Sequence, residues 1–226
     1  GRRCPGGTAV SRKGRERVRR LTGDLADDRS RQVVFLSHCL LNQNVRYLGG
    51  AVCPGAVAAA VSPYVARGTG IVQMPCPEQR VWGGVPKRRL LWLIDHPWFA
   101  RAATRVAPIL RRYLRRRYRA LARRTADDVQ DYLDSGVGVV GVVGVAGSPS
   151  CGVSTTLDLA DSLRALGRRG RRRVSAPWLN GEVVAPAIRP GTGLYLAALV
   201  DELARRDLGV PALEHELGPV GLPCAQ

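Results

Sequence analysis

Three stretches of the chain are continuously apolar instead of alternating between apolar and polar residues. They lie at about 33–36, 70–74 and 137–145, and they are rich in β-branched side chains. A strand that faces water on one side alternates, so continuous apolar runs predict strands that are covered on both faces. Helices on both faces are typical of a parallel α/β sheet. We therefore expect buried strands at about 32–37, 70–74 and 137–145.

The segments between and after these apolar runs contain stretches that are typical of helices. The spacing of their apolar residues predicts helices at about 55–67, 108–124 and 193–206. Thr125 is followed by two acidic residues, which is the pattern of a helix N-cap and first turn, so we expect a separate helix to begin there. A last strand is expected at about 210–216.

The remaining segments are rich in turn-forming residues or charges. Residues 75–98 contain many prolines and glycines, and loops of this length are usually functional. Residues 153–190 are expected to be irregular or weakly helical. Residues 1–30 are basic and are expected to form a flexible arm. The pattern predicts a single Rossmann-like α/β domain over residues 31–226, with a mostly parallel sheet covered by helices.

Composition argues against a membrane or secreted protein. The longest apolar stretch, around residues 136–147, is well short of the roughly 20 residues that a membrane helix needs. The first thirty residues contain no apolar core of a secretory signal. The six cysteines lack the close, regular spacing of a secreted disulfide scaffold. We therefore expect a cytoplasmic protein that does not bind membranes.

The formal net charge of +17 arises from three arginine-rich clusters, at 1–20, 101–124 and 168–173. Such runs are more often solvated helix faces than binding sites. Aromatic residues that would stack on bases are missing from the first and third clusters, whereas Tyr113 and Tyr118 lie in the second. A helix that precedes a strand normally covers a sheet face rather than its rim, so a small-molecule substrate is favoured. RNA is the alternative partner.

Three cysteines each follow one of the predicted strands. Cys39 lies in Ser-His-Cys, Cys76 in Pro-Cys-Pro-Glu and Cys151 in Ser-Pro-Ser-Cys-Gly. Because the carboxyl ends of parallel strands share one rim, these thiols are expected to converge. Thiolates suit soft metals and iron–sulfur clusters. The alternative is that each cysteine is a small buried hydrophobe, since their separations do not match a zinc finger.

Three sequence blocks resemble the signature blocks of the 2-thiouracil desulfurase family. They read Ser-His-Cys-Leu-Leu-Asn-Gln-Asn-Val-Arg at 37–46, Gln-Met-Pro-Cys-Pro-Glu at 73–78 and Gly-Ser-Pro-Ser-Cys-Gly-Val at 147–153. The resemblance covers about residues 32–216 and is greatest to a desulfurase-related branch of that family. Three blocks in the same order are far more specific than any one of them.

The resemblance implies an enzyme with a [4Fe-4S] cluster held by Cys39, Cys76 and Cys151. The fourth iron of such a cluster is free to bind the sulfur of a thiocarbonyl. The implied reaction converts C=S to C=O in a small thiolated heterocycle such as thiouracil and releases sulfide. The implied catalytic residues are Glu78, which would take a proton from water, and Ser148, which would hydrogen-bond the developing charge or relay a proton.

Several other residues are given neither a ligand nor a catalytic role. Cys53 is interpreted as local packing or a spare thiol, and Cys4 and Cys224 as incidental. His38 is interpreted as a structural histidine, and a metal-free cysteine hydrolase lacks a convincing Cys-His-acid set. The better-known branch of the family has an acidic residue where this chain has Leu48, so the identity of the substrate stays open.

Overall fold

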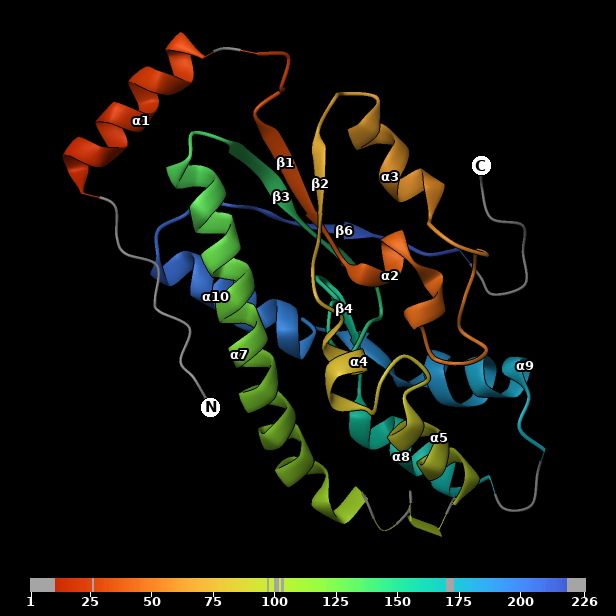
Figure 1. The fold of residues 1–226 in the computed structure, drawn as a ribbon. Coiled ribbons are helices and arrows are strands. Elements are labelled where there is room, and N and C mark those ends of the chain that lie inside the picture. The colour runs from red at the N-terminus through yellow and green to blue at the C-terminus, as the bar shows by residue number, and fades with distance from the viewer. Residues whose placement is uncertain are drawn as a thin grey trace.

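A four-stranded, all-parallel sheet lies at the centre of the computed structural model, which describes residues 11–25, 27–96, 98–99, 102, 104–169 and 173–218. Its strands are β1 (Gln32–Leu36), β2 (Gly70–Gln73), β3 (Gly138–Val145) and β6 (Ala212–His215). The spatial order is β2-β1-β3-β6 (Figure 1). The three continuous apolar runs therefore form three neighbouring strands, as the sequence predicts.

Helices cover both faces of this sheet (Figure 1). Phe35 of β1 packs in the core beneath α7 (Ala107–Asp134) and α10 (Leu194–Arg205). The next residue along, Leu36, packs on the opposite face, in the core that includes α3 (Ala58–Val65). Successive strand residues point to opposite faces, so burial of both faces explains why the runs do not alternate.

The other elements are short and surround the carboxyl ends of the strands. The helices are α2 (His38–Leu41), α4 (Pro77–Val81), α5 (Arg88–Asp95), α8 (Leu159–Gly167) and α9 (Ala176–Trp178). Three short 3₁₀ helices are η1 (Gln43–Val45), η2 (Thr104–Val106) and η4 (Ala185–Ala187). The turn η3 (Leu179–Val184) is π-helical. A two-stranded antiparallel ribbon joins β4 (Thr155–Leu157) to β5 (Ile188–Pro190).

The prediction that 153–190 is irregular or weakly helical was wrong in part, because this segment contains β4, α8 and β5. Helix α8 has a conventional N-cap, since the Asp158 side chain accepts a 2.9 Å hydrogen bond from the Asp161 amide. The Pro- and Gly-rich segment 75–98 likewise contains the short helices α4 and α5. These elements are too short for periodicity to reveal them.

Helix α7 is one continuous helix of 28 residues, so the prediction of a separate helix starting at Thr125 was wrong. Thr125 is buried, and its Oγ1 atom lies 2.8 Å from the hydroxyl oxygen of Tyr195 on α10. The threonine hydroxyl therefore pairs with a neighbouring helix instead of capping its own. Tertiary packing has overridden a local capping preference, and no glycine or proline after Pro108 interrupts α7.

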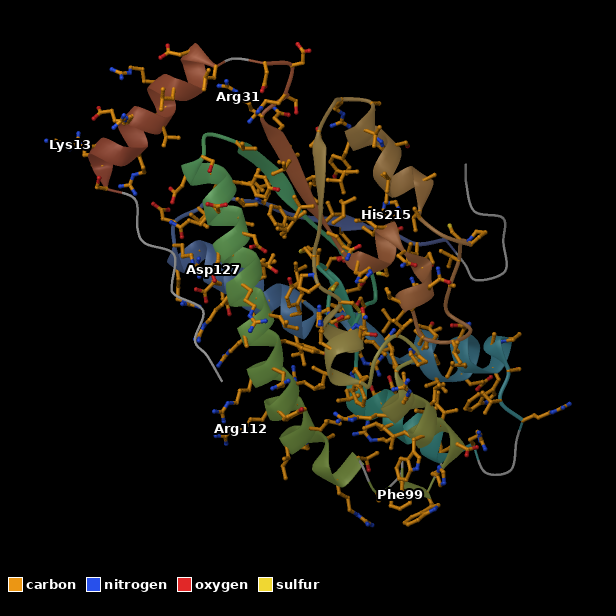
Figure 2. The ribbon with its side chains drawn as sticks, viewed as in Figure 1. Lys13, Arg31, Phe99, Arg112, Asp127 and His215 are labelled. Carbon is orange, nitrogen blue, oxygen red and sulfur yellow. The ribbon has the colours of Figure 1, made fainter. Side chains whose placement is uncertain are left out.

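The arginines of α7 lie on its outer side. Arg112, Arg116 and Arg119 are exposed, and Figure 2 shows Arg112 pointing away from the molecule. Leu114 and Tyr118 on the inner side are buried in the core. The helix is thus amphipathic. Among the helices that the structure describes, none is both long and apolar enough to cross a membrane.

The basic arm contains helix α1 (Arg12–Asp24), which stands apart from the layers around the sheet (Figure 1). The Ser11 side chain caps it by accepting a 3.2 Å hydrogen bond from the Gly14 amide. Residues 1–10 lie outside the described part of the chain. Part of the arm is therefore helical, and its flexibility stays a prediction.

Candidate three-thiol site

The three motif cysteines follow the carboxyl ends of three adjacent strands. Cys39 lies in α2 directly after β1, Cys76 precedes α4 after β2, and Cys151 lies in the turn after β3. All three are free thiols, with Cys151 buried and the other two partly buried. The sheet thus puts the thiols at the same rim, as expected from the strand-end motifs.

Buried polar side chains fix the loop that carries Cys39. The Ser37 hydroxyl donates a 2.9 Å hydrogen bond to the Val143 carbonyl of β3. Gln43, only 1% exposed, donates from Nε2 to the Cys39 carbonyl at 2.6 Å and accepts from the Val52 amide at 2.9 Å. Because both ends of the amide are bonded, Gln43 ties the Cys39 loop to the following segment.

Cys76 is the N-cap residue of α4. Its sulfur accepts a 3.4 Å hydrogen bond from the Gln79 amide, and Pro77 occupies the first turn of the helix. The preceding Met74 amide donates to the Leu36 carbonyl of β1 at 2.8 Å, which extends the pairing of β2 with β1. The position of Cys76 is therefore set by both the sheet and the helix start.

The turn that carries Cys151 is packed closely against β3. The Ser148 hydroxyl oxygen accepts hydrogen bonds from the amides of Cys151 at 3.0 Å and Ser150 at 3.4 Å. The Val145 amide donates to the Cys151 carbonyl at 2.9 Å. A Cβ on Gly144 would lie 2.2 Å from that carbonyl oxygen, so only glycine fits there.

Burial and neighbouring charge disfavour ionisation of all three thiols. Burial raises the pKa of Cys76 to about 12, with a further contribution from the Glu78 carboxylate. Burial also raises the pKa of Cys151, and the Cys39 and Cys76 thiolates raise it further. Burial raises the pKa of Cys39, against the opposing effect of the Arg46 guanidinium. The three thiols thus lie within electrostatic reach of one another and are protonated at neutral pH.

The donor set suits a soft, multi-metal group better than a single ion. Among the described residues, no three His, Cys, Asp or Glu side chains converge closely enough to surround one metal ion. In an iron–sulfur cluster each thiolate binds a different iron, so separated thiols are compatible with it. Thiolate sulfur is also the ligand that such iron prefers. Binding would require the thiols to lose their protons.

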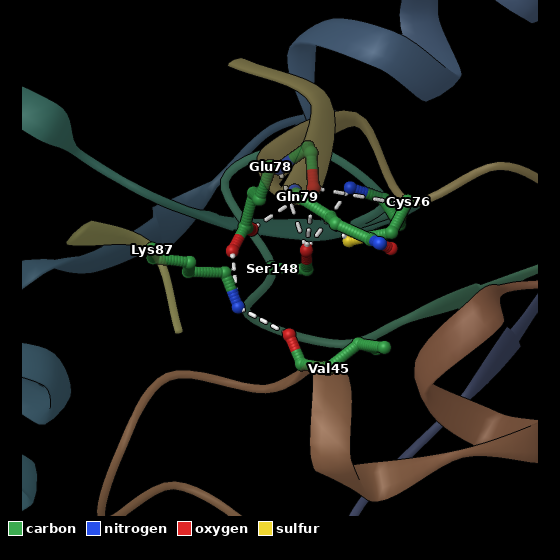
Figure 3. A network of polar contacts seen from close by, with 8 residues as sticks. Val45, Cys76, Glu78, Gln79, Lys87 and Ser148 are labelled. Carbon is green, nitrogen blue, oxygen red and sulfur yellow. Dashed lines mark hydrogen bonds and ion pairs between the residues drawn. The ribbon is translucent and has the colours of Figure 1, made fainter. Parts of the chain in front are cut away.

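Glu78 lies beside the thiols with both carboxylate oxygens engaged (Figure 3). Oε1 accepts a 3.0 Å hydrogen bond from the Ser150 hydroxyl. Oε2 lies 3.3 Å from Nζ of Lys87, a side chain that is only 2% exposed. The same ammonium donates a hydrogen bond to the Val45 carbonyl. The carboxylate is therefore held in a fixed orientation by two side chains from separate segments.

Sequence reasoning missed both partners of Glu78. It selected Ser148 as the catalytic serine. The Ser148 hydroxyl oxygen accepts hydrogen bonds from backbone amides of the Cys151 turn and lies 3.3 Å from Oγ of Ser150. The hydroxyl that donates to Glu78 belongs to Ser150, which also lies 3.6 Å from the Cys151 sulfur. Ser150 is in the same sequence block and could have been considered. Lys87 carries no sequence signal. The catalytic role of Ser148 stays a prediction.

A loop bearing Arg46 and Tyr47 forms another side of the site. The Tyr47 hydroxyl donates a 2.6 Å hydrogen bond to Oδ1 of Asn180, which lies in the π-helical turn η3. Nδ2 of Asn180 donates to the carbonyls of Gly49 at 2.7 Å and Ala176 at 2.8 Å. π-Helical turns are frequent at functional sites. This turn holds the Arg46 loop close to Cys39.

Two buried tyrosines lie behind the thiols. Burial raises the pKa of Tyr118 on α7, and the Glu78 carboxylate raises it further. Burial also raises the pKa of Tyr195 on α10, with a contribution from Cys151. Helix α7 covers a sheet face, as expected for the Arg-rich helix, but it also packs against α4 at the rim. The Arg-rich helix is thus closer to the site than the sequence suggested.

Cys53 does not belong to the site. It packs in the core on the α3 face, and its sulfur is in a disulfide, so its interpretation as a spare thiol was wrong whereas local packing was correct. Cys4 and Cys224 lie outside the described residues. Disulfides are uncommon in the reducing cytoplasm, and the cytoplasmic location stays a prediction.

Two surface hollows of the described structure lie away from the thiols. One hollow of about 180 Å³ lies between α8 and η3, beside Arg168 and Glu182. Another of about 180 Å³ lies between α3 and β6, beside Tyr64 and His215. Neither hollow is lined by any of the three motif cysteines. We therefore assign no role to them.

Fold and site together define a parallel α/β protein with three free thiols at the rim of its sheet, beside an ion pair between a partly buried glutamate and a buried lysine. A family model described as 2-thiouracil desulfurase matches residues 34–205 of the 226-residue chain. The chain belongs to the 2-thiouracil desulfurase family, as the sequence blocks predicted. The matched segment contains all three thiols and Glu78. No curated protein and no solved structure matches the chain.

Proposed function

We propose that this protein is an iron–sulfur-dependent desulfurase that removes sulfur from a small thiolated heterocycle such as thiouracil. In this reaction the oxygen of water forms a bond to the ring carbon, the C–S bond breaks, and both water protons leave with sulfide or the solvent. The observation that carries the proposal is the proximity of an engaged carboxylate, Glu78, to three free thiols on adjacent strand ends. The family match supports it.

Cys39, Cys76 and Cys151 would hold a [4Fe-4S] cluster, which supplies a Lewis-acidic iron toward the thiocarbonyl sulfur because three cysteines leave one iron open. Glu78 would take a proton from the attacking water. Ser150 orients that carboxylate through its hydroxyl. The Ser148 oxygen accepts hydrogen bonds from two amides and lies 3.3 Å from the Ser150 oxygen, and its hydroxyl would turn from Ser150 to donate its proton to the charge that develops on the heterocycle.

Metal analysis together with a sulfide assay tests this proposal. Protein purified without contact with air should contain about four iron and four acid-labile sulfide per chain. It should release sulfide from 2-thiouracil, and removal of the iron should abolish the release. A colourless, folded, zinc-containing protein that releases no sulfide would contradict the proposal, since zinc also prefers thiolates.

Thiolated RNA is a second candidate substrate, favoured by one observation. Helix α7 carries exposed arginines along its outer side and packs against α4, the helix that contains Glu78. A polyanion bound along α7 would therefore lie on the outer side of a helix whose inner side packs against α4. Most of these arginines are explained equally well as a solvated helix face, and we retain the small heterocycle as the main candidate.

A salt series separates the two substrates. Each phosphate contact releases a counterion, so activity on thiolated tRNA should fall steeply with added salt, whereas activity on 2-thiouracil should not. The triple variant Arg112→Gln, Arg116→Gln, Arg119→Gln removes three exposed charges from one side of α7. RNA would be favoured if the protein acted on thiolated tRNA and not on 2-thiouracil, and if this activity fell with added salt and was lost in the triple variant. Activity on 2-thiouracil that neither change affects would favour the small molecule.

A further inference from the structure

Lys87 is an unusual residue in this structure for two reasons. Its side chain is 2% exposed, although lysine is among the residues least often buried. Its backbone is in the left-handed region, with φ of 51° and ψ of 53°, at the residue that precedes α5. Glycine or asparagine would adopt this conformation with less strain. Both the burial and the strain are unfavourable, so the contacts of the side chain must offset them.

Those contacts join two loops of the three-thiol site. The Lys87 ammonium lies 3.3 Å from Oε2 of Glu78, which is two residues after Cys76. It also donates a hydrogen bond to the carbonyl of Val45, in the loop that follows Cys39. A single buried cation therefore bridges the loop after β1 and the loop after β2 (Figure 3).

The bridge continues to the third thiol through Glu78. Ser150, next to Cys151, donates its hydroxyl to Oε1 of the same carboxylate. Each carboxylate oxygen is thus fixed by one partner, and the two partners come from separate segments of the chain. Without Lys87, the Ser150 hydrogen bond alone would leave the carboxylate free to rotate about that contact.

We propose that Lys87 is a positioning residue for desulfuration, which is anchored on the Val45 carbonyl and orients the Glu78 carboxylate. This inference rests on the proposed function, because Glu78 is the group that would accept the proton of water. Lys87 acts through Glu78 and need not touch the substrate. Its loss should therefore reduce turnover more than substrate affinity.

The first test compares three variants of the full chain. Lys87→Met keeps the unbranched side chain up to the Cε position and removes the ammonium group. It should lower kcat by about tenfold to a hundredfold and change KM much less. Lys87→Arg restores a cation and should recover part of the loss. Arg88→Met is the matched control, because Arg88 is exposed and adjacent, and it should leave kcat unchanged. Iron content should be similar in all of them. Unchanged kcat in Lys87→Met would overturn the proposal.

A double-mutant cycle separates positioning from general support of the fold. If Lys87 acts through Glu78, adding Lys87→Met to Glu78→Gln should reduce kcat by less than about twofold beyond Glu78→Gln alone. If Lys87 supports the fold independently, the two losses should multiply, which would overturn the proposal. The double variant removes both members of the ion pair and leaves no uncompensated charge, so it should fold even if Lys87→Met alone is unstable.

A second cycle uses unfolding of the iron-free protein and does not depend on activity. Denaturation midpoints of wild type, both single variants and the double variant should be non-additive, with the double variant more stable than the sum of the single losses predicts. Additive midpoints would overturn the Lys87–Glu78 coupling. Wild-type protein that releases no sulfide but shows non-additive midpoints would overturn the proposed function and leave the coupling supported.

Discussion

The hydroxyl of Ser150 donates a 3.0 Å hydrogen bond to Oε1 of Glu78. Glu78 follows β2 and Ser150 follows β3, and these two strands are not neighbours because β1 lies between them. The hydrogen bond therefore passes across the carboxyl end of β1, which is followed by the segment that carries Cys39. One carboxylate connects the two outer segments of the site across the central one.

The three motif cysteines should be required for iron binding. Cys39→Ala, Cys76→Ala and Cys151→Ala should each abolish or sharply reduce the iron and sulfide content of anaerobically purified protein, because each removes one of three thiolate ligands. The measurement is iron and acid-labile sulfide per folded chain. Cys53→Ala is the control, since Cys53 is buried away from the site; it breaks a disulfide but should retain iron. Full iron content in any of the three variants would exclude that cysteine as a ligand.

Glu78 should be needed for turnover and not for iron binding. Glu78→Gln keeps the size of the side chain but cannot accept a proton, so sulfide release should fall by about a hundredfold or more while the iron content is retained. Single-turnover assays on iron-matched samples give the comparison. Loss of iron in Glu78→Gln would mean that the carboxylate is structural or a ligand.

The two serines of the Cys151 turn should have different effects. Ser150→Ala removes a donor to Glu78 and should lower kcat by about tenfold with little change in stability. Ser148→Ala leaves the Cys151 amide without its partner, which costs about 1–3 kcal/mol when such a group is buried, and it should lower stability and iron content as well as activity. Urea unfolding and iron analysis distinguish the two. Identical effects of both substitutions would contradict the assigned contacts.

Glu214 should contribute to stability in a pH-dependent way. Burial alone would raise the pKa of Glu214, but hydrogen bonds from Ser154 and Val153 lower it below its usual value. A carboxyl whose pKa is lowered by folding stabilises the protein above its unfolded pKa, about 4.3, and this contribution is lost as the pH falls through the lower folded pKa. Glu214→Gln should therefore be destabilising at neutral pH, with a difference that shrinks in acid.

Urea unfolding of wild type and Glu214→Gln, from about pH 7 to about pH 3, checks this dependence. Glu216→Gln is the matched control, because Glu216 is a nearby exposed glutamate. It should follow the wild-type stability curve. A difference between wild type and Glu214→Gln that stayed constant down to acid pH would show that the carboxylate charge is not responsible.

The sequence predicted the strands, and the position of the three thiols at one rim of the sheet, because both depend on simple patterns. Burial of both faces makes a strand continuously apolar, and motifs at strand ends reach the same rim. The continuity of α7 was missed, because the partner of Thr125 is Tyr195, 70 residues away. The role of Lys87 was missed for the same reason, since its contacts with Val45 and Glu78 depend on the assembled loops.

The strand order β2-β1-β3 has a consequence for how the protein is made. A ribosome releases Cys39 first and Cys151 last, and the three thiols become neighbours only after β3 has paired with β1. A local Cys-x-x-Cys peptide can bind metal before it folds, but this ligand set does not exist in the growing chain. Parallel pairing across long connections is also slow. Any metal that needs all three thiols can therefore be delivered only after the chain has been made as far as Cys151 and β3 has paired with β1.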